Sequence, residues 1–130
     1  MVGQVSRAQA DGGWTADQLR VIGKIYAEAE RWGLRDEDRD LLLRIAYRET
    51  GFGLNRSGDH GTSVGIFQWH FGGVWQSTPC FTEYGWAGRW VEDADIDCAA
   101  WAFNRGLQSH WYPWLRVRWL VVVPPDPRGR

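Results

Sequence analysis

The sequence predicts a mainly α-helical single domain whose middle is a glycine-rich loop or a small β-hairpin region. Three observations support this fold class. Two stretches within the first 50 residues carry apolar side chains at helical spacing. Seven glycines then fall between residues 51 and 73, a composition typical of loops and short hairpins. A third helical stretch follows near residue 100. With 130 residues the chain is long enough for one domain and too short for two of ordinary size.

The first helix is expected to open at Thr15, because Gln18 three residues later completes a capping-box pattern. Gly33 directly after Trp32 predicts its end. Four side chains fall on one face at helical spacing: Leu19, Ile22, Tyr26 and Ala29.

The second helix is predicted from an acidic run at residues 36–38, which suits the positive end of a helix dipole. Its apolar side chains are Leu41, Leu42, Leu43, Ile45 and Ala46. We expect it to run to about Thr50, where Gly51 and Gly53 stop it.

Beyond the glycine-rich middle, residues 74–90 are aromatic and rich in turn residues, with no clean period. A third helix is expected from Ile96 to about Asn104, with Asp95 or Asp97 as its N-cap. Pro113 should end regular helix soon afterwards.

The C-terminal part of the chain changes character. Residues 119–123 are apolar and read as a strand or a docking segment, and residues 124–130 form a proline-rich tail that we expect to be mobile. The predicted organisation is an N-terminal arm (1–14), a domain (15–114) and the strand-like segment with its tail (115–130).

Charge and hydropathy exclude several classes of protein. The formal charge of −1 leaves no basic surface for nucleic acid. No run approaches the roughly 18 apolar residues of a membrane span, and the N-terminus has no apolar core of a secretory signal. We therefore expect neither a nucleic-acid partner nor a membrane span.

Ten of the 130 residues are tryptophan. One small core does not easily bury ten indoles, so some are expected to line a groove or an interface. Sugar faces, nucleobases and proteins are all ligands for such rings, and the neutral charge disfavours nucleobases.

The two cysteines, Cys80 and Cys98, match neither a CxxC pair nor a zinc site. They could close one disulfide, worth roughly 3 kcal/mol, or remain two buried thiols. The spacing of Asp93, Asp95 and Asp97 imitates a calcium loop, but Cys98 stands where the loop needs glycine. We expect no metal or cofactor.

Glu49 is the most informative position. It continues an apolar helical stripe formed by Leu42, Ile45 and Ala46. Desolvation and the negative end of the helix dipole would both raise the pKa of its carboxyl group. A carboxyl group that stays protonated near neutral pH can act as a general acid. The alternatives are a salt bridge with a neighbouring arginine such as Arg48, or a boundary residue that points to solvent.

Four segments resemble the lysozyme-like transglycosylase superfamily. Residues 48–52 read Arg-Glu-Thr-Gly-Phe, and residues 58–68 begin with Gly-Asp and close on Gly-Ile-Phe-Gln. Residues 99–106 contain Ala-Ala-Trp-Ala-Phe-Asn, similar to the family's Ala-Ala-Tyr-Asn-Ala-Gly helix, and residues 111–114 read Trp-Tyr-Pro-Trp. The Gly-Asp lead-in is similar to that of goose-type lysozymes. The resemblance covers about residues 36–114.

This resemblance implies a lysozyme-like domain with a groove for peptidoglycan glycan strands and cleavage of the β-1,4 bond from N-acetylmuramic acid to N-acetylglucosamine. Glu49 matches the catalytic acid. The expected substrate-binding residues are Ser63, Gln68, Trp69, Asn104, Trp111 and Tyr112. Phe71 is a further stacking candidate, and core packing is the alternative for each aromatic side chain.

The second carboxylate would decide the mechanism. Asp59 matches an aspartate that goose-type lysozymes are thought to use in holding water, although an aspartate here could simply cap a turn. His70 replaces a further aspartate expected after Gln68. A lytic transglycosylase needs no second carboxylate, because one glutamate serves as acid and then as base. Thr50 and Phe103 depart from the family's Ser and Tyr.

Two functions follow. The favoured one is a peptidoglycan-cleaving glycosidase, a bacteriophage endolysin or a virion-associated lysin acting on the bacterial cell wall. The alternative is a lysozyme-like module without activity that binds glycan or serves a structural role, with virion contacts or self-association through residues 119–123.

Overall fold

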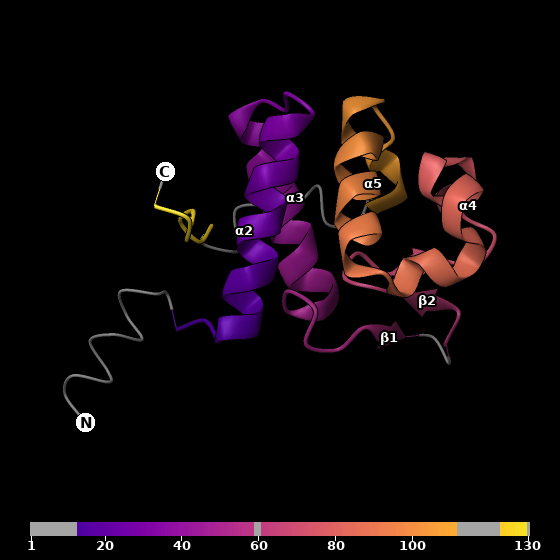
Figure 1. Ribbon diagram of the computed structural model, residues 1–130, viewed down its shortest axis with the longest axis horizontal. Helices are drawn as coiled ribbons and strands as arrows, with labels where there is room; N and C mark the ends of the chain where they lie inside the picture. Colours follow the sequence, from indigo (N-terminus) through magenta and orange to yellow (C-terminus); the bar gives the residue numbers. More distant parts are fainter. Residues whose placement is uncertain (1–12, 59–60, 112–122, 130) are drawn as a thin grey trace.

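The computed structural model describes residues 13–58, 61–111 and 123–129. Within these ranges the protein is mainly helical with a small antiparallel sheet (Figure 1), which confirms the predicted class. The helical elements are α2 (Ala16–Arg31), α3 (Asp36–Thr50), η2 (Val74–Ser77), α4 (Pro79–Tyr84), η3 (Gly85–Trp90), α5 (Glu92–Asn104) and η4 (Gln108–Trp111). The strands are β1 (Ser57–Gly58), β2 (Ser63–Val64) and β3 (Trp69–His70).

Helix α2 is capped as the sequence predicts. The Thr15 hydroxyl accepts from the Gln18 amide at 3.1 Å, and the Thr15 amide donates to Gln18 Oε1 at 2.9 Å. Trp32 is the C-cap, and Gly33 follows with a φ of +66°, a left-handed conformation that glycine adopts without strain.

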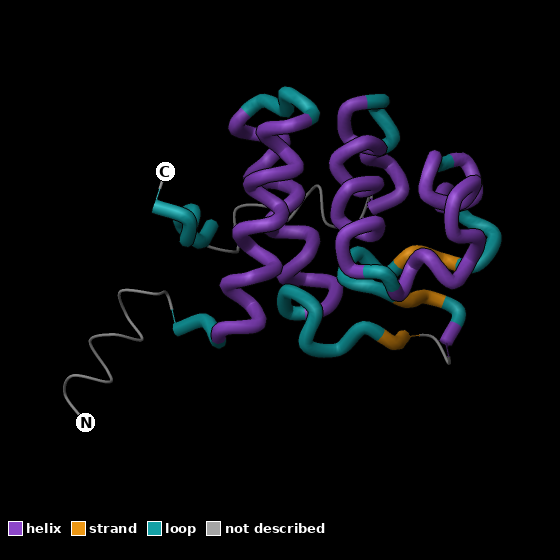
Figure 2. The backbone as a smooth tube through the Cα atoms, viewed as in Figure 1, coloured by secondary structure: helices purple, strands orange, loops and turns teal. Residues whose placement is uncertain are grey.

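Helix α3 also has the predicted limits. Three acidic residues occupy its first turn, and Gly51 ends it in the left-handed conformation, with a φ of +62°. The chain then turns into the short strands, which pair in the order β1-β2-β3. Figure 2 shows this sheet beside the helical ends and joined to them by loops.

The three long helices share one end with the sheet. Gln18 Nε2, near the start of α2, donates to the Gly51 carbonyl at the end of α3, at 3.1 Å. Arg20, also near the start of α2, pairs with Glu92 at the start of α5, at 3.0 Å. Helices α2 and α5 therefore run parallel to each other and antiparallel to α3 (Figure 1). We call this end of the helices the sheet end, and the opposite end the far end.

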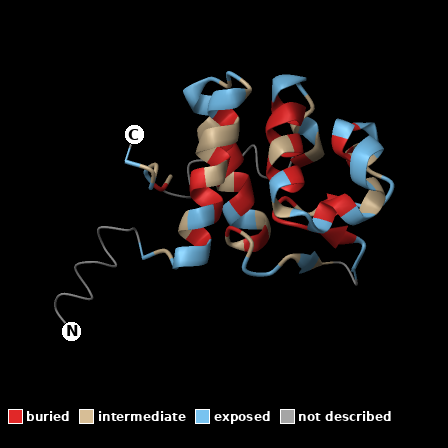
Figure 3. Cartoon of the chain, viewed as in Figure 1, coloured by how far each residue is buried: buried red, intermediate tan, exposed pale blue. Residues whose placement is uncertain are grey.

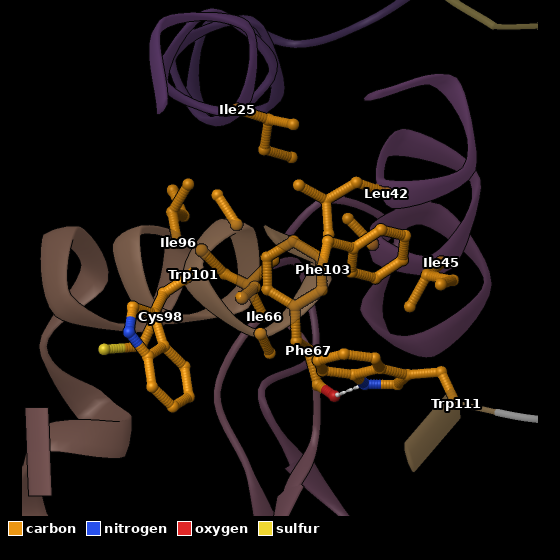
Figure 4. Packing of buried hydrophobic residues seen from close by; sticks show 14 of the residues in the cluster. Ile25, Leu42, Ile45, Ile66, Phe67, Ile96, Cys98, Trp101, Phe103 and Trp111 are labelled. Carbon is orange, nitrogen blue, oxygen red and sulfur yellow. Dashed lines mark hydrogen bonds between the residues drawn. The ribbon is translucent and has the colours of Figure 1, made fainter. Parts of the chain in front are cut away.

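The core lies where α2, α3 and α5 face one another (Figure 3). Figure 4 shows side chains from all three helices meeting the loop residues Ile66 and Phe67. Trp111 closes this cluster, and its Nε1 donates to the Phe67 carbonyl at 2.8 Å. None of the helices described here has the length and apolar character that crossing a membrane requires.

Two sequence expectations in the second half are wrong. Helix α5 begins at Glu92 rather than at Ile96, so Asp95 lies inside it and is not its cap. Helix α4 was not expected, although Thr78 followed by Pro79 is a recognisable helix start. The Thr78 hydroxyl accepts from the Phe81 amide at 3.3 Å.

The expected mobility of the proline-rich tail stays a prediction, and in the fold residues 124–129 contact α2. Pro124 is buried, and its carbonyl accepts from the Tyr26 hydroxyl at 2.6 Å. Pro127 lies against α2 at Gly23, where an added Cβ would be 3.5 Å from its ring. The small residue on α2 thus leaves room for the tail. Residues 119–122 of the apolar segment lie outside the described residues, and Val123 packs partly buried against the core.

Cys80 and Cys98 form a disulfide that joins α4 to α5. Both cysteines are buried, at 5% and 1% exposure. The two alternatives left open by the sequence are thereby resolved in favour of the bridge, which fastens the aromatic segment 74–90 to the third long helix.

Loss of this disulfide is expected to lower the free energy of unfolding by roughly 3 kcal/mol, because the cross-link restricts the unfolded chain. Urea denaturation of the wild type and of Cys80→Ala/Cys98→Ala would measure the difference. Addition of dithiothreitol should weaken the wild type alone, and equal midpoints for the two proteins would contradict the expectation.

Candidate functional site

Glu49 lies in the last turn of α3, at the sheet end. The preceding residues of its stripe, Leu42, Ile45 and Ala46, are completely buried, whereas Glu49 is half-buried where the helix leaves the core. The apolar stripe therefore carries a carboxylate to the boundary of the domain, beside the glycine-rich segment.

Thr50 joins the end of α3 to that segment. Its hydroxyl donates to the Ile66 carbonyl at 2.7 Å and accepts from the Gly53 amide at 2.9 Å. The side chain is 5% exposed. Because serine has the same hydroxyl, the departure from the family's Ser leaves this chemistry available.

The Gln68 side chain holds the glycine-rich loop by hydrogen bonds to its backbone. Its Nε2 donates to the carbonyl oxygens of Arg56 at 3.1 Å and of Gly65 at 3.0 Å. Its φ is +53°, an uncommon conformation for a residue with a Cβ. Its Oε1 lies against Gly58, where an added Cβ would come within 2.2 Å of that atom. Gln68 was expected to bind substrate through its side-chain amide, but in the fold the amide nitrogen binds two backbone carbonyl groups.

Asp95 lies beneath the same loop and was not recognised from the sequence as part of the site. Its Oδ2 accepts from the Ile66 amide, and its Oδ1 accepts from Trp69 Nε1 at 2.6 Å. The side chain is 1% exposed. Burial raises the pKa of Asp95 to about 7, although the hydrogen bonds from Ile66 and Trp69 oppose that rise.

The close approach of the Asp95 carboxylate to the backbone explains why residue 65 is a glycine. A Cβ on Gly65 would lie 2.5 Å from the Arg89 carbonyl oxygen and 2.6 Å from Asp95 Oδ2. The φ of Gly65 is +89°, so glycine meets both the steric and the conformational requirement.

Trp69 and Trp111 belong to the core. Core packing is the alternative that the sequence left open for each of these side chains. Trp69 is fully buried and Trp111 is 1% exposed, so neither offers a face to a sugar. Their rings meet edge-on, with centroids 5.2 Å apart. The expectation that they stack on substrate is wrong because both rings turn inward: Trp69 binds the buried Asp95, and Trp111 packs against Phe67.

Ser63 is likewise not open to a ligand in this conformation. It is 2% exposed, and its Oγ lies 2.8 Å from Nδ1 of His70 across the β2–β3 pair. His110 stacks on Trp69 with ring centroids 5.6 Å apart. Burial, with a smaller contribution from the nearby His70, lowers the pKa of His110 to about 4.

Asn104 is separated from Glu49 by the length of the helices. At the end of α5, its Nδ2 donates to the Trp32 carbonyl at 3.0 Å, which places it at the far end. The expected grouping of Asn104 with Glu49 is wrong because α5 runs antiparallel to α3. Asp59 and Tyr112, the other two predicted site residues, lie outside the described residues.

Phe71 is an exposed aromatic side chain. It is 61% exposed and lies over Trp86, with ring centroids 4.6 Å apart and planes inclined by 31°. The buried Arg89 guanidinium lies 5.2 Å from the Trp86 ring centroid, and its Nη1 donates to the carbonyl oxygens of Thr62 and Trp69. The Arg89 guanidinium also lies 5.9 Å from the Phe71 ring centroid. Of the aromatic residues proposed from the sequence and described here, Phe71 is the one exposed enough to contact a ligand.

A network of charges fixes the chain between α3 and β1. Arg56 Nε donates to the Gly53 carbonyl at 2.9 Å, and its Nη2 pairs with Glu92 at 2.8 Å. Hydrogen bonds from Arg20, Lys24 and Arg56 hold the pKa of Glu92 well below its usual range. The start of α5 thereby fastens the loop that follows Glu49.

Replacing Thr50 tests the connection between α3 and the loop. Thr50→Val keeps the shape but leaves the Ile66 carbonyl and the Gly53 amide without this partner, at an expected cost of about 1–3 kcal/mol. Thr50→Ser keeps the hydroxyl and should lose only the buried methyl, about 1 kcal/mol. Chemical denaturation measures both variants, and a valine variant at least as stable as the serine variant would refute the role of the hydroxyl.

His110 is expected to make stability depend on pH. In the unfolded chain it binds a proton below about pH 6.5, but in the fold only below about pH 4. Between these values the unfolded state binds more protons, so the stabilising contribution falls as pH drops from 6.5 to 4. His110→Phe keeps an aromatic ring and removes this dependence. Urea denaturation across that range should show a stability difference that changes with pH, and a constant difference would contradict the assignment.

No protein-family model, curated protein or solved structure matches this chain. The resemblance to the lysozyme-like superfamily therefore rests on the four sequence segments alone. The function has to be argued from the residues of the site.

Proposed function

We propose that the protein cleaves the glycan strands of peptidoglycan, with Glu49 as the general acid that protonates the departing glycosidic oxygen. The observation that carries the proposal is the position of Glu49: a half-buried carboxyl group at the end of an apolar helical stripe, next to Thr50, whose hydroxyl ties the helix end to the glycine-rich turn at Ile66.

The position of Glu49 at the boundary of the domain suits a general acid that has to reach a bound glycan. Glu49 lies in the last turn of α3, where the helix leaves the core and the glycine-rich loop begins. The loop beside it is held by hydrogen bonds from the Gln68 side chain to the carbonyl groups of Arg56 and Gly65. Phe71 supplies an exposed ring for the apolar face of a sugar.

The proposal covers two chemical outcomes. Water attack would make the protein a muramidase and would call for a second carboxylate, for which Asp59 is the candidate. Attack by the 6-hydroxyl of muramic acid would give a 1,6-anhydro product, with Glu49 returning as the base. The proposed setting is a bacteriophage endolysin or a virion-associated lysin, and it rests on the resemblance.

A catalytically inactive lysozyme-like module is the second candidate. It is favoured because several residues expected to bind substrate have structural roles instead. Trp69 and Trp111 are in the core. Asn104 is at the far end, and the Gln68 amide nitrogen binds backbone.

Glu49→Gln is expected to reduce glycan cleavage roughly 10²-fold or more, because the amide cannot donate the acidic proton. The measurement is mass spectrometry of the fragments released from purified peptidoglycan of several wall types. Glu37→Gln is the matched control, since this exposed residue lies in the first turn of the same helix.

Anhydro-muropeptides from the wild type would identify a lytic transglycosylase, and reducing-end muramic acid would identify a muramidase. Full activity in Glu49→Gln would refute the role of the acid. Absence of product from every wall type with the wild type would refute the enzyme and favour the inactive module.

A further inference from the structure

The buried carboxylate of Asp95 uses both of its oxygens to hold the turn that closes the glycine-rich segment. Oδ2 accepts from the amide of Ile66, the residue whose carbonyl binds Thr50, and Oδ1 accepts from Trp69 Nε1. Gln68 lies between these two anchors with a left-handed backbone. The carboxylate thus fixes both sides of the strained residue.

The charged groups packed around Asp95 come from four elements. Arg56, in the loop before β1, attracts the carboxylate electrostatically, but its own guanidinium pairs with Glu92 in the previous turn of α5. Arg89 of η3 binds the carbonyl of Trp69, and His110 of η4 stacks on the Trp69 ring. Within the described part of the chain Asp95 makes no ion pair of its own, so N–H donors alone satisfy it.

We propose that Asp95 is the positioning residue of the candidate site, and that protonation of its carboxyl group weakens one anchor of the 65–69 turn, so that the order of this turn depends on pH. The meaning of this switch for catalysis rests on the proposed function, whereas the switch itself does not.

The geometry shows how protonation acts on these anchors. The oxygen that takes up the proton becomes a hydroxyl, which accepts more weakly than a carboxylate oxygen and needs an acceptor of its own. Protonation therefore weakens the hydrogen bond on that oxygen, either the one from Trp69 Nε1 or the one from the Ile66 amide. Burial stabilises the neutral carboxyl group and brings the pKa of Asp95 to about 7. Protonation of this group can therefore be followed near neutral pH.

The test is nitrogen-15 NMR of the full chain from pH 5 to 9. The Trp69 indole signal is identified by its disappearance in Trp69→Phe. In the wild type this signal and the Ile66 amide signal should titrate together with a midpoint near pH 7. Asp95→Asn, which imitates the protonated group, should abolish the titration. Asp93→Asn, an exposed change on the same helix, should retain it.

Signals of Trp69 and Ile66 that stay constant across this range in the wild type would overturn the proposal, and this measurement needs no variant at Asp95 to fold. Titration that persists in a folded Asp95→Asn would also overturn it. Because the signals are read without substrate, this outcome is separate from the activity of the protein. If cleavage is observed, the wild type should lose kcat below pH 7 and Asp95→Asn should show a flat profile in that range.

Discussion

The peptide groups of Ile66 connect the elements around the candidate site. Its carbonyl accepts from Thr50 at the end of α3, and its amide donates to Asp95 inside α5. Two antiparallel helices are thereby joined through one residue of the glycine-rich segment. Buried polar groups are costly unless they are paired, so these two bonds leave few alternative positions for the loop.

The same pairing explains the unusual backbone nearby. Once Ile66 is fixed between α3 and α5, Gly65 must accept two close contacts and Gln68 must reverse the chain with a positive φ. The Gln68 side chain then satisfies carbonyl groups that the turn exposes. The glycine at position 65 therefore reflects close approach of the backbone to a buried carboxylate.

The sequence predicted the elements that local signals define. The capping box at Thr15, the acidic turn at residues 36–38 and the stop at Gly51 fixed α2 and α3, because those signals act within one helical turn. It did not predict the role of Asp95. An aspartate near a helix start ordinarily reads as a cap, and only the tertiary approach of Ile66 and Trp69 makes it an internal acceptor.

For the candidate site, the sequence predicted the position of some residues and not of others. Glu49 and its neighbour Thr50 are placed as the motif indicated, because their position depends on helix periodicity. The predictions that Asn104 and Trp69 bind substrate were wrong. The position of Asn104 depends on the direction of α5, and that of Trp69 depends on which side of a strand packs inward. A one-residue change of register reverses that side, and two-residue strands give the sequence no period from which to read it.

Asp95 and His110 oppose each other in their effect on stability. The raised pKa of Asp95 means that the folded state binds more protons than the unfolded state between about pH 4 and 7, so its contribution strengthens the fold as pH falls. His110 has a lowered pKa, and its contribution weakens the fold over nearly the same range. The two side chains flank Trp69, one beneath its nitrogen and one on its ring. The two contributions oppose each other over nearly the same pH range, so a denaturation curve reports only their sum, whereas local probes of Ile66 and Trp69 report the turn itself.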